Sequence, residues 1–139
     1  MLTNKDYCDY ETCVALKELG YNEKSNWWFS KYLNEDSGQM ELVHICDNPA
    51  HLNYDSWGIV PKDFVIRPSL YEAQKWLREE KDVIIALCPY TYNIVDKTHT
   101  WTFEIWFGDN LEIEIHDFKS YEEALSEGIK EAIKILKEK

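Results

Sequence analysis

The sequence predicts an α+β fold, with an antiparallel sheet of about five strands, helices packed mainly on one face, and a C-terminal αβββα unit. Two segments, Ser69–Glu72 and Ser120–Glu123, share a helix-start pattern in which a serine precedes a glutamate by three residues. Between them, residues 100–107 alternate between an apolar series (Trp101, Phe103, Ile105 and Phe107) and a series that is polar except for Trp106. An antiparallel sheet that is apolar on one face needs helices to cover that face.

The first half of the chain is predicted to hold a helix and a hairpin. The helix covers residues 9–19, begins at an aspartate N-cap, and ends before Gly20. Residues 27–33 form an extended apolar segment, residues 34–38 carry a turn signal, and residues 40–46 return as a strand. These three segments together predict a β-hairpin.

The second half has clearer signals. Residues 63–66 suggest a short strand, and a helix follows from the capping box at Ser69. The uninterrupted apolar run at 83–88 predicts a central strand that Pro89 ends. After a hairpin turn at 108–110, the chain returns as a strand and ends in an amphipathic helix that begins at residue 121. We therefore expect one α+β domain over residues 1–139.

The net charge of the chain disfavours some classes of binding partner and allows others. There are 26 acidic and 15 basic residues, for a formal net charge of −11. Such a charge opposes binding to nucleic-acid phosphates and to anionic membranes, and it allows a basic protein partner. No apolar run approaches the ~20 residues of a membrane span, and the first residues lack a signal-peptide pattern. These two observations predict a cytoplasmic protein, and the four scattered cysteines predict reduced thiols.

Alternation along the last hairpin predicts a polar sheet face. Leu111, Ile113 and Ile115 are expected on the apolar face, and the opposite face would carry Glu104, Trp106, Glu112 and Glu114. An exposed tryptophan beside carboxylates is typical of an interface, so these four residues are the candidate partner-binding set. Two alternatives remain open: the carboxylates are ordinary solvated strand residues, or the N-terminal hairpin covers Trp106.

A metal site is the alternative function. His44 and Cys46 alternate along a predicted strand, and His51 follows in a loop. Zinc accepts histidine and cysteine ligands, so these residues suggest a metal-binding protein or a metal-dependent hydrolase. The competing interpretation is a buried Cys46 and a half-exposed His44, because the tight Cys-x-x-Cys spacing of zinc sites is missing.

Enzymatic chemistry has little support in the sequence. Cys88 with His99 or His116 is a conceivable nucleophile pair, but Cys88 ends an apolar run, where burial raises the thiol pKa. The sequence shows no glycine-rich phosphate loop or dinucleotide fingerprint. We therefore expect a non-enzymatic protein–protein interaction module without a cofactor. A homodimer is the third hypothesis.

Three segments carry a resemblance to other proteins, namely residues 16–21 (Leu-Lys-Glu-Leu-Gly-Tyr), residues 71–79 and residues 121–124 (Tyr-Glu-Glu-Ala). In these segments the chain resembles small uncharacterised cytoplasmic proteins of gut Bacteroidetes bacteria and their mobile elements and phages. The resemblance implies a cytoplasmic protein and a mobile-element origin. That group has no assigned activity, so the resemblance implies no site residue.

Overall fold

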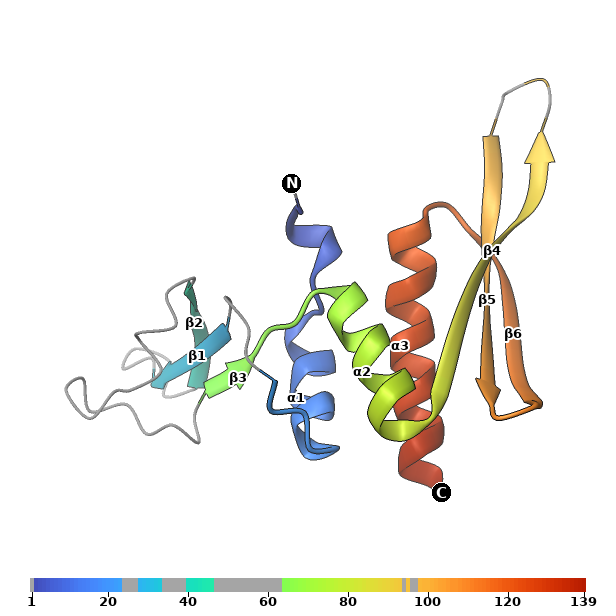
Figure 1. The fold of residues 1–139 in the computed structure, drawn as a ribbon. Helices are drawn as coiled ribbons and strands as arrows, with labels where there is room; N and C mark the ends of the chain where they lie inside the picture. The colour runs from blue at the N-terminus through green and yellow to red at the C-terminus, as the bar shows by residue number, and fades with distance from the viewer. Residues whose placement is uncertain (1, 24–27, 34–39, 47–63, 94, 96–97) are drawn as a thin grey trace. The chain divides into compact units, whose positions relative to one another are not determined.

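The computed structural model describes residues 2–23, 28–33, 40–46, 64–93, 95 and 98–139 (Figure 1). Its elements, in chain order, are η1 (Asn4–Asp6), α1 (Tyr10–Glu18), β1 (Trp28–Leu33), β2 (Met40–Cys46), β3 (Phe64–Ile66), α2 (Leu70–Lys81), β4 (Val83–Asn93), β5 (Thr98–Phe107), β6 (Asn110–Phe118) and α3 (Tyr121–Glu138). The expected α+β class is confirmed.

The described strands form two three-stranded antiparallel sheets, in the orders β2-β1-β3 and β4-β5-β6. The expected single sheet of about five strands is therefore not found among the described residues. The reason is that β3 joins the N-terminal hairpin by pairing with β1, and α2 then separates β3 from β4 along the chain.

The chain divides into two compact units. The larger unit contains Met1–Cys8 and Ser69–Lys139, and the smaller unit contains Asp9–Pro68. The expectation of one domain over residues 1–139 stays a prediction.

In the smaller unit, α1 begins and ends where local hydrogen bonds cap it. The Asp9 side chain accepts a hydrogen bond from the backbone N–H of Thr12. At the other end Gly20 has a φ of 103°, and the N–H of Tyr21 donates to the carbonyl of Leu16 over 2.9 Å. This Schellman arrangement needs a left-handed residue, which explains why the helix ends at a glycine.

The aromatic ring of Phe29 lies in the core of the smaller unit and is 3% exposed. Tyr10 of α1 packs edge-on against it at 5.6 Å between ring centroids. The guanidinium carbon of Arg67 lies 5.0 Å from the same centroid. The helix, β1 and the segment after β3 therefore meet around one β1 side chain.

In the larger unit, α2 and α3 cover one face of the β4-β5-β6 sheet (Figure 1). The expected capping box is present at the start of α2: Ser69 accepts from the N–H of Glu72, whose carboxylate accepts from the N–H of Ser69. The side chains between the helices and the sheet are buried and almost entirely apolar: Leu70, Ala73, Leu77, Val83, Ile85, Phe103, Ile105, Leu125, Ile129 and Ala132.

Helix α3 approaches the sheet closely at Gly128. A Cβ atom at this position would lie 2.9 Å from Cγ2 of Ile85 and 3.3 Å from Cγ of Phe103. Carbon atoms in van der Waals contact are about 3.5–4.0 Å apart. The absence of a side chain at Gly128 therefore sets how near the helix lies to β4 and β5.

Strand β4 corrects two expectations. It runs through Pro89 to Asn93, and it lies at the edge of the sheet, while β5 is the central strand. An edge strand tolerates proline because the missing N–H costs no hydrogen bond on its outer side. The strand also changes register between Pro89 and Tyr92, which accommodates the ring.

The N-terminal segment is held against the start of α2. The hydroxyl of Tyr71 donates to Oδ1 of Asp6 over 3.0 Å, and Tyr7 forms an isolated bridge with Ser69. The backbone N–H of Thr3 donates to Asp6 and lowers the pKa of that carboxyl. Burial, followed by the Asp6 contact, raises the pKa of Tyr71 to about 12.

Across the described part of the chain, every helix is too short or too polar to cross a membrane.

Candidate functional site

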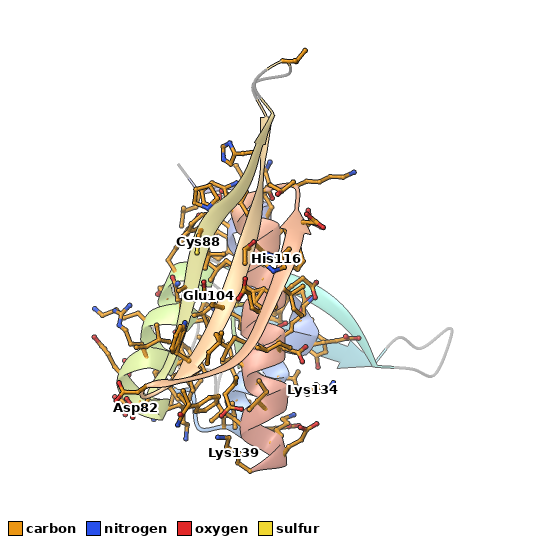
Figure 2. The ribbon with its side chains drawn as sticks, turned by 90° about the vertical axis from the view of Figure 1, so that its right-hand side faces the viewer. Asp82, Cys88, Glu104, His116, Lys134 and Lys139 are labelled. Atoms are coloured by element: carbon orange, nitrogen blue, oxygen red, sulfur yellow. The ribbon has the colours of Figure 1, made fainter. Side chains whose placement is uncertain are left out.

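The most distinctive surface of the larger unit is the face of the β4-β5-β6 sheet that points away from α2 and α3. We call it the open face. Strand register arranges nine of its side chains in three rows, each running across β4, β5 and β6. The rows are Ile84, Trp106 and Leu111; Ala86, Glu104 and Glu114; and Cys88, Thr102 and His116. Figure 2 shows Cys88, Glu104 and His116 on the strands, with α3 behind the sheet.

The first row is apolar and accessible. Ile84 is 43% exposed and Leu111 is 44% exposed, while Trp106 between them is half-buried. A continuous row of large apolar side chains across three strands, exposed to water at both ends, is unusual enough to require an explanation.

Leu111 was expected on the apolar face with Ile113 and Ile115, and this expectation is wrong. The β5–β6 register shifts between Ile105 and Trp106, so that Leu111 lies opposite Trp106 on the open face. A β-bulge adds a residue to one strand and so reverses the side-chain alternation beyond it. Ile113 stays opposite Ile105 on the helix-covered face.

The same bulge separates Glu112 from the other three candidate residues. Its Oε1 atom lies 3.6 Å from Nζ of Lys139, the residue that follows α3. That Nζ also lies 4.0 Å from the ring centroid of Phe107. The structure therefore brings Glu104, Trp106 and Glu114 together and directs Glu112 towards the end of α3.

Glu104 connects the first row to the third. Its Oε2 atom accepts a hydrogen bond from Nε1 of Trp106 over 2.9 Å, and its Oε1 atom accepts from Sγ of Cys88 over 3.7 Å. Burial, and then the charge of Glu104, raise the pKa of the Cys88 thiol. Since the thiolate is the nucleophilic form, this environment works against Cys88 as a nucleophile.

A second hydrogen-bonded chain joins Glu114, His116 and Thr102. Nε2 of His116 lies 3.0 Å from Oε1 of Glu114, and its Nδ1 lies 2.9 Å from Oγ1 of Thr102. Because a carboxylate only accepts, a neutral His116 donates from Nε2 and accepts the Thr102 hydroxyl at Nδ1. A hydroxyl, an imidazole and a carboxylate in series also occur in hydrolases. Here Thr102 is only 2% exposed, so a substrate cannot reach its oxygen.

The structure forms neither of the two Cys88–histidine pairs that were considered from the sequence. His116 engages Thr102 and Glu114, while the ring of His99 packs against Trp101 at 5.0 Å between centroids. The thiol of Cys88 is directed to Glu104.

The metal hypothesis lies mostly outside the described residues. Positions 44 and 46 belong to β2, where their backbones pair with Ser30 and Trp28, but their side chains and the whole of His51 are not described. In the part of the chain that the structure describes, no three His, Cys, Asp or Glu side chains are grouped to hold a metal ion. A site at His44, Cys46 and His51 stays a prediction.

Sequence reasoning placed Thr102 and His116 on the polar face, but it missed four members of the open face: Ile84, Ala86, Cys88 and Leu111. Alternation along residues 83–88 does place Ile84 on the other face of the strand from Val83 and Ile85, so the position of Ile84 could have been predicted from the sequence. The position of Leu111 had no such signal, because the bulge depends on pairing with β5.

Comparison of the chain with protein families, curated proteins and solved structures finds no match. The functional argument therefore rests on the open face itself.

Proposed function

We propose that this protein is a non-catalytic protein–protein interaction module. In this proposal the αβββα unit of residues 69–139 presents the open face to a protein partner. The observation that carries it is the row formed by Ile84, Trp106 and Leu111, in which two apolar side chains are more than two-fifths exposed. Tryptophan is enriched among the residues that dominate binding energy at protein interfaces.

The geometry of Trp106 supports this role. The hydrogen bond to Glu104 restrains the indole ring before any partner arrives. A side chain that is already ordered loses less conformational entropy on binding, a cost of about 0.5–1.5 kcal/mol for a side chain that must be immobilised. Trp106 is thus suited to act as the anchor, with Ile84 and Leu111 as its flanks.

The chemistry of the same face favours binding over catalysis. The hydroxyl of Thr102 is buried, and the thiol of Cys88 has a raised pKa. Neither group is prepared to attack a substrate. The two polar chains on the face instead hold the side chains of neighbouring strands in place.

The test is partner capture with variants of the apolar row. Ile84→Ser/Leu111→Ser removes exposed apolar surface and leaves the helix-covered core intact. Glu79→Ser/Lys134→Ser, at exposed positions of α2 and α3, is the matched control. We expect the control, but not the open-face variant, to retain the proteins that the wild type captures from a host lysate. Circular dichroism checks that both variants are folded.

Site-directed photocrosslinking gives the second readout. A photoreactive residue in place of Leu111 is expected to form a covalent adduct with a captured protein, whereas one in place of Lys134 is not. Equal adduct formation from both positions, or capture that survives Ile84→Ser/Leu111→Ser unchanged, contradicts the assignment of the open face.

A further inference from the structure

We infer that the open face recognises a cationic, amphipathic segment of its partner, with an arginine or lysine bound at Glu104 and Glu114 and an apolar side chain on the Ile84–Trp106–Leu111 row. This inference rests on the proposed function and adds the chemistry of the partner.

The cross-strand pairing of two carboxylates is the main argument. Glu104 of β5 and Glu114 of β6 are direct register partners. Such partners have Cβ atoms about 4.5–5.5 Å apart, and like charges in this position are destabilising. A cation bound between the two side chains relieves their repulsion, so the binding of positive charge is favoured by the structure of the free protein.

The carboxylate oxygens have room for a further donor. Glu104 accepts from Trp106 and Cys88, and Glu114 accepts from His116, one contact at each named oxygen. Two carboxylate oxygens together offer about four acceptor sites. The Glu114 side chain is 38% exposed, so an incoming cation can reach it. The nine side chains of the three rows include no lysine or arginine that would compensate these charges.

The spacing of the rows defines the pattern that the partner needs. The first two rows are two residues apart along β4 and β5, which corresponds to about 7 Å. Residues i and i+2 of an extended segment are separated by the same distance, and residues i and i+4 of a helix by about 6 Å. Arginine fits best, because its planar fork pairs with carboxylates and its face stacks on aromatic rings such as Trp106.

Charge also argues against other occupants. A second copy placed symmetrically on this face would bring a further Glu104 and Glu114 close to the first pair, in a chain of net charge −11. A nucleic-acid backbone would place phosphates beside the same carboxylates. A cationic protein segment is the occupant that improves the electrostatics of the free face.

The experiment measures binding of a fluorescent peptide of alternating leucine and arginine, beside peptides in which glutamate or serine replaces arginine. The test variant is Glu104→Gln/Glu114→Gln, which keeps an acceptor oxygen for Trp106. The control is Glu79→Gln/Glu80→Gln on exposed positions of α2, and both variants lose two negative charges. We expect the open-face variant to weaken arginine-peptide binding by about tenfold or more, and the control by less than about twofold.

The inference is overturned if both variants weaken arginine-peptide binding equally, or if the wild type binds the serine peptide as tightly as the arginine peptide. A dimer seen by light scattering that Leu111→Ser abolishes also overturns it, because a second copy would then occupy the face. These failures differ from failure of the proposed function. If no protein is captured through the face although the arginine peptide binds there, the proposed function is wrong and the cation preference remains. If face-dependent capture persists without that preference, only this inference is wrong.

Discussion

Trp106 and Glu104 lie two residues apart on β5, and the indole Nε1 donates a hydrogen bond to Oε2 of the carboxylate over 2.9 Å. Side chains at i and i+2 of a strand share a face, so the contact is compatible with regular strand geometry. It joins the largest apolar side chain of the open face to one of its two carboxylates. A partner that contacts the tryptophan therefore also meets the negative charge.

This contact predicts a measurable coupling free energy between Glu104 and Trp106 in the stability of the protein. A hydrogen bond to a charged group contributes about 1.5–3 kcal/mol when buried, and we expect about 1 kcal/mol at this half-buried position. A double-mutant cycle with Glu104→Ala and Trp106→Phe, followed by urea unfolding, measures it. Glu112→Ala is the control, because its ion pair with Lys139 is exposed and should contribute less than about 1 kcal/mol. A coupling near zero would show that the indole is not restrained.

The close approach at Gly128 predicts that Gly128→Ala destabilises the protein. Alanine gains up to about 1 kcal/mol of helix propensity over glycine. The added methyl group, however, would lie 2.9 Å from Ile85, and overpacking of this kind costs about 1–3 kcal/mol. We expect a lower urea midpoint for Gly128→Ala and a nearly unchanged one for Lys134→Ala, which is exposed on the same helix. A more stable Gly128→Ala protein would contradict the packing of α3.

The buried Thr102 hydroxyl predicts a structural role for its hydrogen bond. Thr102→Val keeps the side-chain shape and removes the hydroxyl that lies 2.9 Å from Nδ1 of His116. We expect a loss of about 1–2 kcal/mol in the free energy of unfolding. In a His116→Ala background the same substitution should cost clearly less. An equal cost in both backgrounds would mean that the threonine–histidine contact contributes nothing.

The raised pKa of Cys88 predicts slow alkylation. Iodoacetamide reacts with the thiolate, so at pH 8 the Cys88 peptide should label more slowly in the native protein than in urea. Glu104→Gln removes the nearby negative charge, and the native labelling rate should then rise. Mass spectrometry of the Cys88 peptide gives the rate, and the buried Cys8 and Cys13 serve as internal references. An unchanged rate in Glu104→Gln would exclude this charge as a cause.

The raised pKa of Tyr71 predicts a loss of stability in alkali. Burial and the Asp6 hydrogen bond favour the neutral phenol in the folded state, with a pKa of about 12 against 10.0 for the ordinary group. The stabilising contribution is complete below pH 10 and is lost as pH rises through 12. We expect the stability difference between the wild type and Tyr71→Phe to shrink over this range. Urea unfolding at several pH values measures it, and a constant difference would contradict the shift.

Local signals in the sequence determined the ends of the helices. The sequence predicted N-caps at Asp9, Ser69 and Ser120 because aspartate and serine are preferred at this position. In the structure, each of these side chains accepts a hydrogen bond from a backbone N–H three residues later. Alternation likewise identified β5, and with it the face shared by Glu104 and Trp106. These features depend on contacts within a few residues, and such contacts leave a pattern in the chain itself.

Tertiary structure alone decided which strand is central, how many sheets form, and which side chains make up the open face. Pro89 looked like a strand end, because only the edge position of β4 makes a proline acceptable there. Leu111 lies opposite Trp106 because the register between β5 and β6 shifts, and register is a property of two strands together. Glu112 instead forms an ion pair with Lys139. The sequence by itself determined the elements and the acidic, aromatic character of the chain. The pairing of distant strands decided that Ile84, Trp106 and Leu111 would lie in one row beside Glu104 and Glu114.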